Sequence, residues 1–236
     1  LVFVILSATP FPLWVYFAWS ATVLAWLGLQ EMGGTVRSAT ILRLLVLVAC
    51  GGVALAELSY QLRPVVRIEA TAAVYVIGDS ISAGTGAGEK VWPQVLAEIQ
   101  GRQVVNLARA GATARTAWVQ ADEVPAEASV VLVEIGGNDL LKGHPPLAFE
   151  ADLRGLLARL IGRDRAIVMF ELPLPPFHNR YGRIQRVLAD EFGVTLLPKR
   201  LLAGVLAGRD STLDGLHLSQ QGHRQMAELM AGVLGS

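Results

Sequence analysis

The hydrophobic positions of this chain are unevenly distributed. No charged residue occurs between Leu1 and Gln30, whereas from about residue 70 onward charged and apolar residues alternate as in ordinary globular proteins. This pattern predicts a membrane-anchoring segment over residues 1–60, a linker over 61–71 and a globular domain over 72–236.

The first apolar segment runs from Phe11 to Leu29. At about 1.5 Å per residue, a helix of this length crosses a hydrocarbon core of about 30 Å. Its aromatic residues are of the kind that favours the membrane–water interface: Trp14, Tyr16, Trp19 and Trp26. A buried core helix is the alternative, but a small domain rarely encloses an uncharged stretch of this length. We therefore expect a transmembrane helix.

The second apolar segment covers about residues 41–58, with an uncharged run from Leu44 to Ala56. That run is shorter than a full span, so the flanking Arg43 and Glu57 would have to reach towards the interface. The interpretation we favour is a second transmembrane helix that forms an N-terminal hairpin with the first.

Two other interpretations of the second segment stay open. It could be the apolar core of a signal peptide that starts near Met32, with Ala54-Leu55-Ala56 as the cleavage site. The stretch Leu47-Val48-Ala49-Cys50 also resembles a bacterial lipoprotein cleavage box, in which Cys50 would carry the lipid. Because Cys50 is the single cysteine, an internal disulfide and a cysteine-based metal site are excluded.

The charges beside these segments do not decide the orientation in a membrane. Arg37 and Arg43 between the segments are balanced by Arg63 and Arg67 after the second one. The signal-peptide and lipoprotein interpretations both direct the globular domain out of the cytoplasm. We therefore expect a protein anchored in the bacterial inner membrane, with its globular domain extracytoplasmic.

Short apolar runs alternate with helical patterns in the globular part. The runs expected to form buried strands are residues 73–77, 103–107, 130–135, 166–171 and 194–197. Helical periodicity is found at residues 91–99, 114–121, 147–161, 180–192 and 220–234. Short strands that are apolar on both faces and separated by helices indicate an α/β fold with a parallel sheet covered on both sides. Ligands bind such sheets beyond the carboxyl ends of the strands.

The charge balance excludes one class of partner. The chain carries 20 basic and 20 acidic residues, for a formal net charge of +0, and no block of like charge stands out. A nucleic-acid partner is therefore not expected.

The first predicted strand leads into Gly78-Asp79-Ser80. A serine at a strand-to-helix turn exposes its hydroxyl at the edge of the sheet, where it can act as a nucleophile. The spacing differs from the Gly-x-Ser-x-Gly elbow of other hydrolases. A plain helix N-cap is the alternative, since aspartate and serine both cap helices well.

Three further segments favour the nucleophile. Gly111 follows the second strand and leaves a backbone N–H unobstructed. Gly136-Gly137-Asn138-Asp139 follows the third strand and could aim an N–H group at a developing oxyanion. Asp214-Gly215-Leu216-His217 precedes the last helix, where a carboxylate three residues before an imidazole can accept its Nδ1–H.

These four segments resemble, in order and in approximate spacing, the sequence blocks of the SGNH (GDSL-type) hydrolases. The similarity is greatest to the thioesterase I/lysophospholipase L1/arylesterase branch and covers about residue 74 to the C-terminus, without the N-terminal segments. It implies an α/β, three-layer, flavodoxin-like fold with about five parallel strands, to which the N-terminal transmembrane helices are added.

The resemblance also implies a role for each matching residue. Ser80 Oγ attacks an acyl carbonyl, and His217, oriented by Asp214, acts as general base and then as general acid. The N–H groups of Ser80 and Gly111 and the side chain of Asn138 form the oxyanion hole. This acyl-enzyme chemistry requires neither a metal ion nor an organic cofactor.

Three functions are compatible with these residues. The first is a membrane-tethered esterase or thioesterase whose substrate is a small-molecule or lipid acyl ester, such as a lysophospholipid, an acyl-thioester or an aryl ester. The second is an acetylesterase or acyltransferase that acts on envelope carbohydrate. The third is a non-catalytic membrane protein that uses the fold for binding.

Other polar residues are expected to be structural. We expect Asp79 to brace the turn that presents Ser80, and Glu134 and Glu171 to be hydrogen-bonded near strand ends. His144 and His178 are predicted in loops, with His144 a candidate for the mouth of the pocket, and His223 is predicted on a helix surface.

Overall fold

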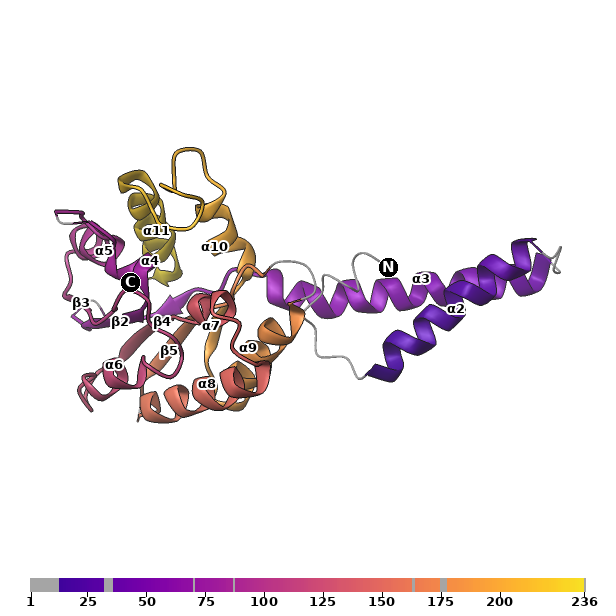
Figure 1. The fold of residues 1–236 in the computed structure, drawn as a ribbon, viewed down its shortest axis with the longest axis horizontal. Helices are drawn as coiled ribbons and strands as arrows, with labels where there is room; N and C mark the ends of the chain where they lie inside the picture. Colours follow the sequence, from indigo (N-terminus) through magenta and orange to yellow (C-terminus); the bar gives the residue numbers. More distant parts are fainter. Residues whose placement is uncertain are drawn as a thin grey trace. The chain divides into compact units, whose positions relative to one another are not determined.

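The computed structural model describes residues 13–31, 36–69, 71–86, 88–162, 164–174 and 178–235. The chain divides into two compact units, Leu1–Tyr60 and Gln61–Ser236 (Figure 1). The boundary at residue 60 coincides with the end of the predicted anchoring segment. The predicted linker is grouped with the larger unit. Because this unit contains the residues that the sequence predicts to be catalytic, we call it the catalytic unit.

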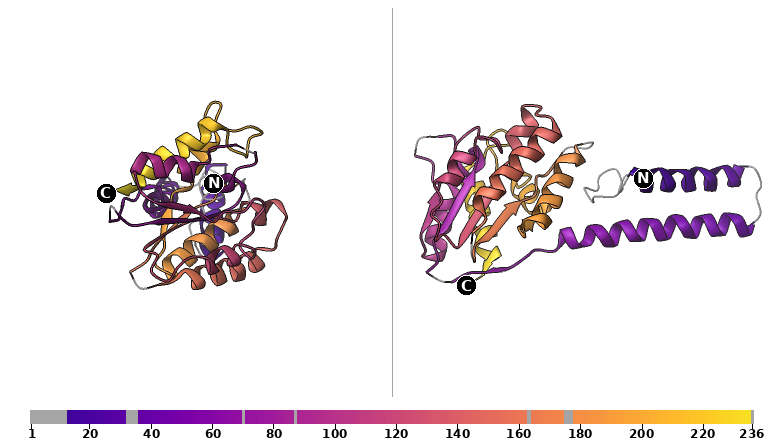
Figure 2. Two further views of the ribbon diagram at one scale, coloured as in Figure 1. Left: turned by 90° about the vertical axis from the view of Figure 1, so that its left-hand side faces the viewer. Right: turned by 90° about the horizontal axis from the view of Figure 1, so that it is seen from below.

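The N-terminal unit contains a pair of adjacent helices, α2 (Leu13–Glu31) and α3 (Val36–Leu58), which lie side by side (Figures 1 and 2). Trp19 and Val53 are buried where the helices meet. Most other large apolar side chains of the pair are exposed, among them Phe17, Leu24 and Val48. The pair therefore presents apolar side chains outward.

Part of α3 is suited to a membrane by length and composition. Within the described residues, Thr40–Leu58 is the stretch long and apolar enough to span a bilayer, and the apolar part of α2, Phe17–Leu29, is shorter. A signal sequence has the same properties, and so does a core helix. Both predicted apolar segments thus form helices, and one of them reaches spanning length.

The core of the catalytic unit is a five-stranded sheet. Its strands are β2 (Val74–Gly78), β3 (Val104–Asn106), β4 (Val130–Glu134), β5 (Ala166–Phe170) and β6 (Thr195–Leu197). Their spatial order is β3-β2-β4-β5-β6, and every neighbouring pair is parallel. The predicted parallel α/β sheet is confirmed.

Helices cover both faces of this sheet and make three layers. One face carries α5 (Trp92–Gln100), α10 (Lys199–Leu206) and α11 (Gln220–Val233), and the other α6 (Trp118–Asp122), α8 (Pro146–Leu160) and α9 (Asn179–Glu191) (Figure 2, left). In β4, Val131 and Val133 pack into one layer, whereas Val130 and Leu132 pack into the other. This alternation is the period of two that side chains follow along a strand.

Three short helices were not predicted: α4 (Ser80–Ala83), α7 (Gly137–Leu141) and α10. Helix α6 also begins later than the predicted residue 114, because residues 113–117 form a turn. There, the Thr113 N–H donates to Thr116 Oγ1 over 2.8 Å, and the Ala114 N–H donates to Asp139 Oδ2 over 2.9 Å. These backbone groups are therefore satisfied without a further helical turn.

The segment predicted as a linker packs against the rest of the catalytic unit. The short helix η1 (Ser59–Gln61) is followed by β1 (Val66–Arg67), which pairs in parallel with the last strand, β7 (Leu234–Gly235). The Ile68 N–H donates to the Gly235 carbonyl over 3.2 Å. Val66 and Ile68 pack their apolar side chains against the core, which accounts for the order of this segment.

Candidate active site

Ser80 is the first residue of α4 and directly follows the turn at the carboxyl end of β2. The preceding Asp79 caps the helix, because its Oδ1 accepts the Ile81 N–H at 3.0 Å. A Cβ atom on Gly78 would come within 2.7 Å of the Ser82 side chain, so the sharp turn requires glycine there. The turn thus holds Ser80 at the edge of the sheet, as the sequence predicts.

Asn138 lies in α7, just beyond the end of the neighbouring strand β4. Its Nδ2 donates to Asp79 Oδ2 over 2.9 Å. The helix begins after Gly136, whose φ of +117° disfavours any other residue. The side-chain amide of Asn138 is therefore held against Asp79, the residue that precedes Ser80.

Gly111 follows β3 and has a φ of +74°. No atom outside its chain neighbours lies within 4 Å of the position that a Cβ would take, so there is open space on that side of the residue. Its carbonyl accepts Lys142 Nζ at 2.9 Å, which ties this loop to the residue after α7. Asp139, whose pKa is raised by burial, accepts the Ala114 N–H and joins the same two segments.

Asp214 and His217 form a direct pair in the loop before α11. The distance between His217 Nδ1 and Asp214 Oδ2 is 2.6 Å, and Asp214 Oδ1 accepts the N–H groups of Leu216 and His217 at 3.0 and 2.8 Å. The hydrogen bond from His217 is the main reason that the pKa of Asp214 lies well below its usual value. The carboxylate thus orients the imidazole so that Nε2 faces away from it.

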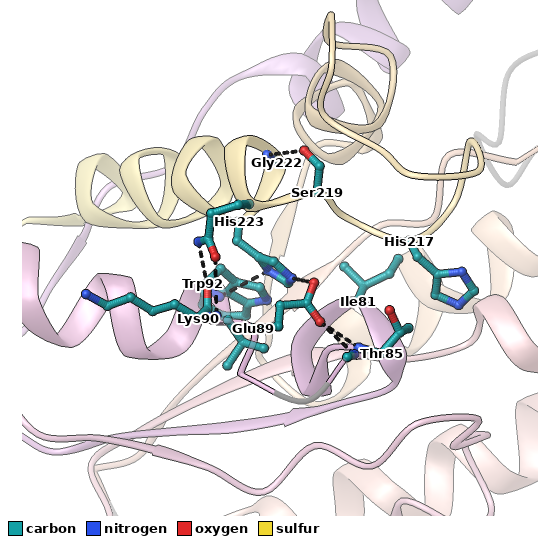
Figure 3. A network of polar contacts seen from close by, with 12 residues as sticks. Ile81, Thr85, Glu89, Lys90, Trp92, His217, Ser219, Gly222 and His223 are labelled. Atoms are coloured by element: carbon teal, nitrogen blue, oxygen red, sulfur yellow. Dashed lines mark hydrogen bonds and ion pairs between the residues drawn. The ribbon is translucent and has the colours of Figure 1, made fainter.

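The His217 loop packs into the same apolar layer as the Ser80 turn, because Leu216 contacts the cluster that contains Ile81. Burial raises the pKa of the Asp79 carboxyl group, and His217 is among the groups that oppose this rise. Figure 3 shows His217 on the loop that leads to Ser219 and α11, with Ile81 next to it in that view. Within the described residues, no hydrogen bond joins Ser80 Oγ to His217. Such contacts are often long without substrate and tighten in the Michaelis complex.

A buried polar network beneath Ser80 is not apparent from the sequence. The Trp92 Nε1–H donates to Ser82 Oγ over 3.1 Å, and Ser82 Oγ lies 3.0 Å from Oε2 of Glu134, the last residue of β4. Glu134 is almost completely buried. Burial, reinforced by the charge of Asp79, raises its pKa well above the usual value. Glu134 was expected to be hydrogen-bonded near a strand end, but its proximity to Asp79 was not anticipated.

The prediction that His223 lies on a helix surface is wrong, because its side chain is buried. Its Nδ1 accepts the Trp92 N–H at 3.2 Å, so the proton is on Nε2, which lies 2.9 Å from Glu89 Oε1. Glu89 Oε2 in turn accepts the N–H groups of Thr85 and Gly86 (Figure 3). These contacts fasten the loop that follows α4 to α11.

Burial lowers the pKa of His223, and the interaction with Glu89 offsets only part of this effect. For Glu89, the hydrogen bonds from the loop and from His223 outweigh the effect of burial and hold the pKa below its usual value. Both shifts favour a neutral imidazole on His223 beside an ionised carboxylate on Glu89.

The remaining polar residues that the sequence analysis singled out make contacts within the fold. His144 Nδ1 lies 3.3 Å from Asp139 Oδ1, and Glu171 forms a buried ion pair with Arg186 at 2.7 Å. His178 is the N-cap of α9. Among the described residues, no group of three or more His, Cys, Asp or Glu side chains could hold a metal ion.

Comparison with solved structures defines the class of the fold. The crystal structure of TesA superposes with a TM-score of 0.60 and 24% identity, covering 67% of this chain and 95% of that one. The psychrotrophic esterase EstA from Pseudoalteromonas also gives a TM-score of 0.60, at 20% identity, covering 68% of this chain and 95% of that one. The catalytic unit has the α/β fold of the SGNH hydrolases.

Sequence comparison then gives the family. Residues 76–225 match the model of the GDSL-like Lipase/Acylhydrolase family, and the chain belongs to that family. It is 29% identical over 181 residues to the thioesterase 1/protease 1/lysophospholipase L1 of Escherichia coli (strain K12), covering 71% of this chain and 86% of that protein. An arylesterase of Vibrio mimicus is 28% identical over 179 residues, with coverages of 70% and 90%. The protein is an ester-hydrolysing serine hydrolase.

Proposed function

We propose that Ser80, His217 and Asp214 are the catalytic residues of this hydrolase. His217 Nε2 takes the proton of Ser80 Oγ as the oxygen attacks the acyl carbonyl, and Asp214 stabilises the imidazolium that forms. His217 then protonates the departing alcohol or thiol, which leaves an acyl-enzyme. In the second half, His217 takes a proton from water as the water oxygen attacks the acyl carbonyl. His217 then returns this proton to Ser80 Oγ as the bond between the acyl group and Oγ breaks and the acid leaves.

The oxyanion hole in this proposal is formed by three donors. These are the N–H groups of Ser80 and Gly111 and the Nδ2–H of Asn138 that does not bond to Asp79. Ser80 is at the first position of a helix, where the N–H has no intrahelical partner. Gly111 is exposed, and the position that its Cβ would take is open. Removing one such donor typically lowers kcat by about a hundredfold to a thousandfold.

The observation that carries the proposal is the hydrogen bond from Asn138 Nδ2 to Asp79 Oδ2 at 2.9 Å, because it holds the segment after β4 against the residue that precedes Ser80. The loop of Asp214 and His217 adds support, since Leu216 packs against the apolar cluster that contains Ile81, the residue after Ser80. We infer from these contacts that the three segments meet at Ser80.

Labelling by a fluorophosphonate tests the nucleophile. We expect the wild-type protein to be labelled and Ser80→Ala not to be labelled. The exposed Ser129 precedes β4, at the opposite edge of the sheet from Ser80, so Ser129→Ala is a matched control that should label like the wild type. Equal labelling of Ser80→Ala and the wild type would contradict the assignment.

We further propose that the substrate is an amphiphilic acyl ester or thioester. Leu141 lies one helical turn after Asn138 in α7, and Leu213 directly precedes Asp214; both side chains are about two-thirds exposed, at 65% and 68%. If these leucines line the path of the substrate, they would suit an acyl chain better than a carbohydrate. The names of the relatives, thioesterase, lysophospholipase and arylesterase, support the same range of substrates.

A substrate series tests this assignment. Rates on short aryl esters, long-chain acyl-thioesters and lysophospholipids should include turnover of the long-chain compounds. Turnover restricted to acetyl esters would contradict the lipid substrate and favour the action on acetylated carbohydrate.

A membrane tether at the N-terminus is also part of the proposal. Support comes from the apolar outer surface of α2 and α3 and from the length of Thr40–Leu58. We place the catalytic unit on the extracytoplasmic side. Protease accessibility of the catalytic unit in intact and lysed spheroplasts tests this, since protection in the intact spheroplasts would contradict it.

A further inference from the structure

Glu134 lies directly beneath the turn that carries Ser80. Its Oε2 accepts Ser82 Oγ–H at 3.0 Å and lies 3.4 Å from the Asp79 backbone N. The direction of the first bond follows from Trp92, because an indole N–H can only donate and Ser82 Oγ is its acceptor. The hydroxyl hydrogen of Ser82 is therefore available for Glu134, and Oε2 needs no proton of its own.

The carboxyl groups of Glu134 and Asp79 are buried close to each other, at 1% and 3% exposure, and Glu134 Oε2 accepts the Asp79 backbone N–H at 3.4 Å. Two neighbouring carboxyl groups that are both buried do not both ionise, so one of them keeps a proton. The position of this proton determines the charge next to Asn138.

The surroundings place the proton on Glu134. Its carboxyl group is almost completely buried at the end of β4, and both burial and the charge of Asp79 raise its pKa. Burial raises the pKa of Asp79 as well, but the hydrogen bonds from the Ile81 N–H and from Asn138 Nδ2 oppose that rise. Asp79 is thus the better carboxylate of the two.

The charge on Asp79 decides which end of the Asn138 amide faces it. A carboxylate can only accept, so it selects the Nδ2–H2 group, which lies 2.9 Å from Asp79 Oδ2. A protonated Asp79 could instead donate to the amide oxygen of Asn138. The amide could then turn, and its oxygen would repel a developing oxyanion.

We propose that Glu134 is a positioning residue that acts through Asp79 on Asn138: as a neutral acid it donates a hydrogen bond to Asp79, keeps it ionised and so fixes the amide of Asn138 for the oxyanion hole. Glu134 keeps its proton throughout the reaction. This inference rests on the proposed role of Asn138.

Two variants of Glu134 separate the neutral donor from the charge. Glutamine keeps the shape, an N–H for Asp79 and an oxygen for Ser82, whereas leucine has a similar volume and no polar group. We expect Glu134→Gln to keep kcat within about threefold of the wild type, and Glu134→Leu to lower kcat about tenfold or more with KM within about twofold. Rates are expressed per fluorophosphonate-reactive site, so that misfolded protein does not count. A folded Glu134→Gln as slow as Glu134→Leu would overturn the inference.

A double-mutant cycle tests the route through Asn138. If Glu134 acts through this amide, Glu134→Leu should cause less than about a twofold further loss of kcat in an Asn138→Ala background. Independent, multiplicative losses would overturn the inference while leaving Asn138 in the oxyanion hole. An unchanged kcat in Asn138→Ala alone would instead overturn the proposed oxyanion hole.

Infrared spectroscopy covers the case in which Glu134→Leu does not fold. At neutral pH, the difference spectrum between the full-length wild type and Glu134→Gln should contain the carbonyl-stretch band of a protonated carboxylic acid. A difference spectrum that contains only carboxylate bands would overturn the inference.

Discussion

Three aspartates fix the backbone around the proposed site by accepting N–H groups. Their donors are Ile81 for Asp79, Ala114 for Asp139, and Leu216 and His217 for Asp214. Hydrogen bonds from backbone N–H groups to a carboxylate are charge-assisted and directional. The segments that carry the proposed oxyanion donors are therefore held in place before the substrate arrives, which is the condition for electrostatic stabilisation of a transition state.

Removal of the Asn138 side chain tests this arrangement. We expect Asn138→Ala to lower kcat about a hundredfold or more, because one of three oxyanion donors is lost. The free energy of unfolding should change little, since Asn138 is only partly buried. Steady-state kinetics and urea unfolding in mild detergent measure the two effects. An unchanged kcat would contradict the assigned role.

The pair of His223 and Glu89 predicts a dependence of stability on pH. Burial lowers the pKa of His223 from its ordinary value of 6.5, so below that pH the unfolded chain binds a proton that the folded chain does not. The contribution of neutral His223 to the free energy of unfolding is therefore fully present above about pH 6.5. It is lost as the pH falls from there towards the pKa that His223 has in the folded protein. We expect His223→Gln to be less stable than the wild type at about pH 7.5, with a smaller difference at about pH 5.5.

Urea unfolding of both full-length proteins at the two pH values measures this effect. Comparison with the variant isolates His223 from the other groups that titrate. A difference in the free energy of unfolding that does not change with pH would contradict a neutral, buried His223.

At the residue scale, the contact between Asp214 and His217 could be predicted because three residues separate them in the chain. The buried network could not. His223 is surrounded in the sequence by Gln220, Gln221 and Arg224, which is the pattern of an exposed helix face. Its burial depends on packing between α11 and α5, and its partner Glu89 is 134 residues away. Local periodicity does not contain that information.

At the scale of elements, the packing of α6 on α8 depends on Trp118. Its indole lies between the guanidinium groups of Arg115 and Arg159, 3.6 and 3.8 Å from the ring centroid, and its Nε1–H donates to the Asp152 carbonyl. A Cβ on Gly155 of α8 would lie 2.3 Å from the ring. The close approach of the two helices therefore requires glycine at this position.

Alanine at this position should destabilise the fold. We expect Gly155→Ala to lower the free energy of unfolding by about 1–2 kcal/mol, because overpacking costs about 1–3 kcal/mol and helix propensity returns up to about 1 kcal/mol. In α10, a Cβ on Gly204 would have no neighbouring atom within 4 Å, so Gly204→Ala should stabilise by up to about 1 kcal/mol. Urea unfolding distinguishes the two variants, and equal effects would contradict the packing argument.

The strands of the sheet were predictable because they are short and apolar on both faces, which is typical of a covered parallel sheet. The short helices α4 and α7 were not, since four or five residues are too few to show a period of 3.6. The pairing of β1 with β7 was also not predicted. Two residues in each strand give no sequence pattern, and the contact joins opposite ends of the catalytic unit.

At the scale of the whole molecule, the division at residue 60 predicts that anchoring and catalysis can be separated. We expect the full chain to remain in the membrane fraction after alkaline extraction. A chain of residues 61–236 should be recovered in the soluble fraction, with kcat/KM on a short ester within about threefold of the full chain, because the proposed catalytic residues all lie in it.

Fractionation and steady-state kinetics check this expectation. Release of the full chain by alkaline extraction would contradict the tether. Loss of the fold in residues 61–236 would show that the N-terminal helices are needed for stability. Introduction of arginine at the exposed Val48 of α3 is a second route, and it should weaken membrane retention.

The parallel pairing of β1 with β7 makes the catalytic unit a candidate for circular permutation. Val66 lies opposite Leu234, so residues 61–65 could serve as the bridge that fuses the two ends. New ends opened at the exposed Gly101, between α5 and β3, would leave the order of strands in the sheet unchanged. In this permuted chain, the loop of His217 would be synthesised before the turn of Ser80. Recovery of activity in such a protein would show that the site assembles whichever part of it is synthesised first.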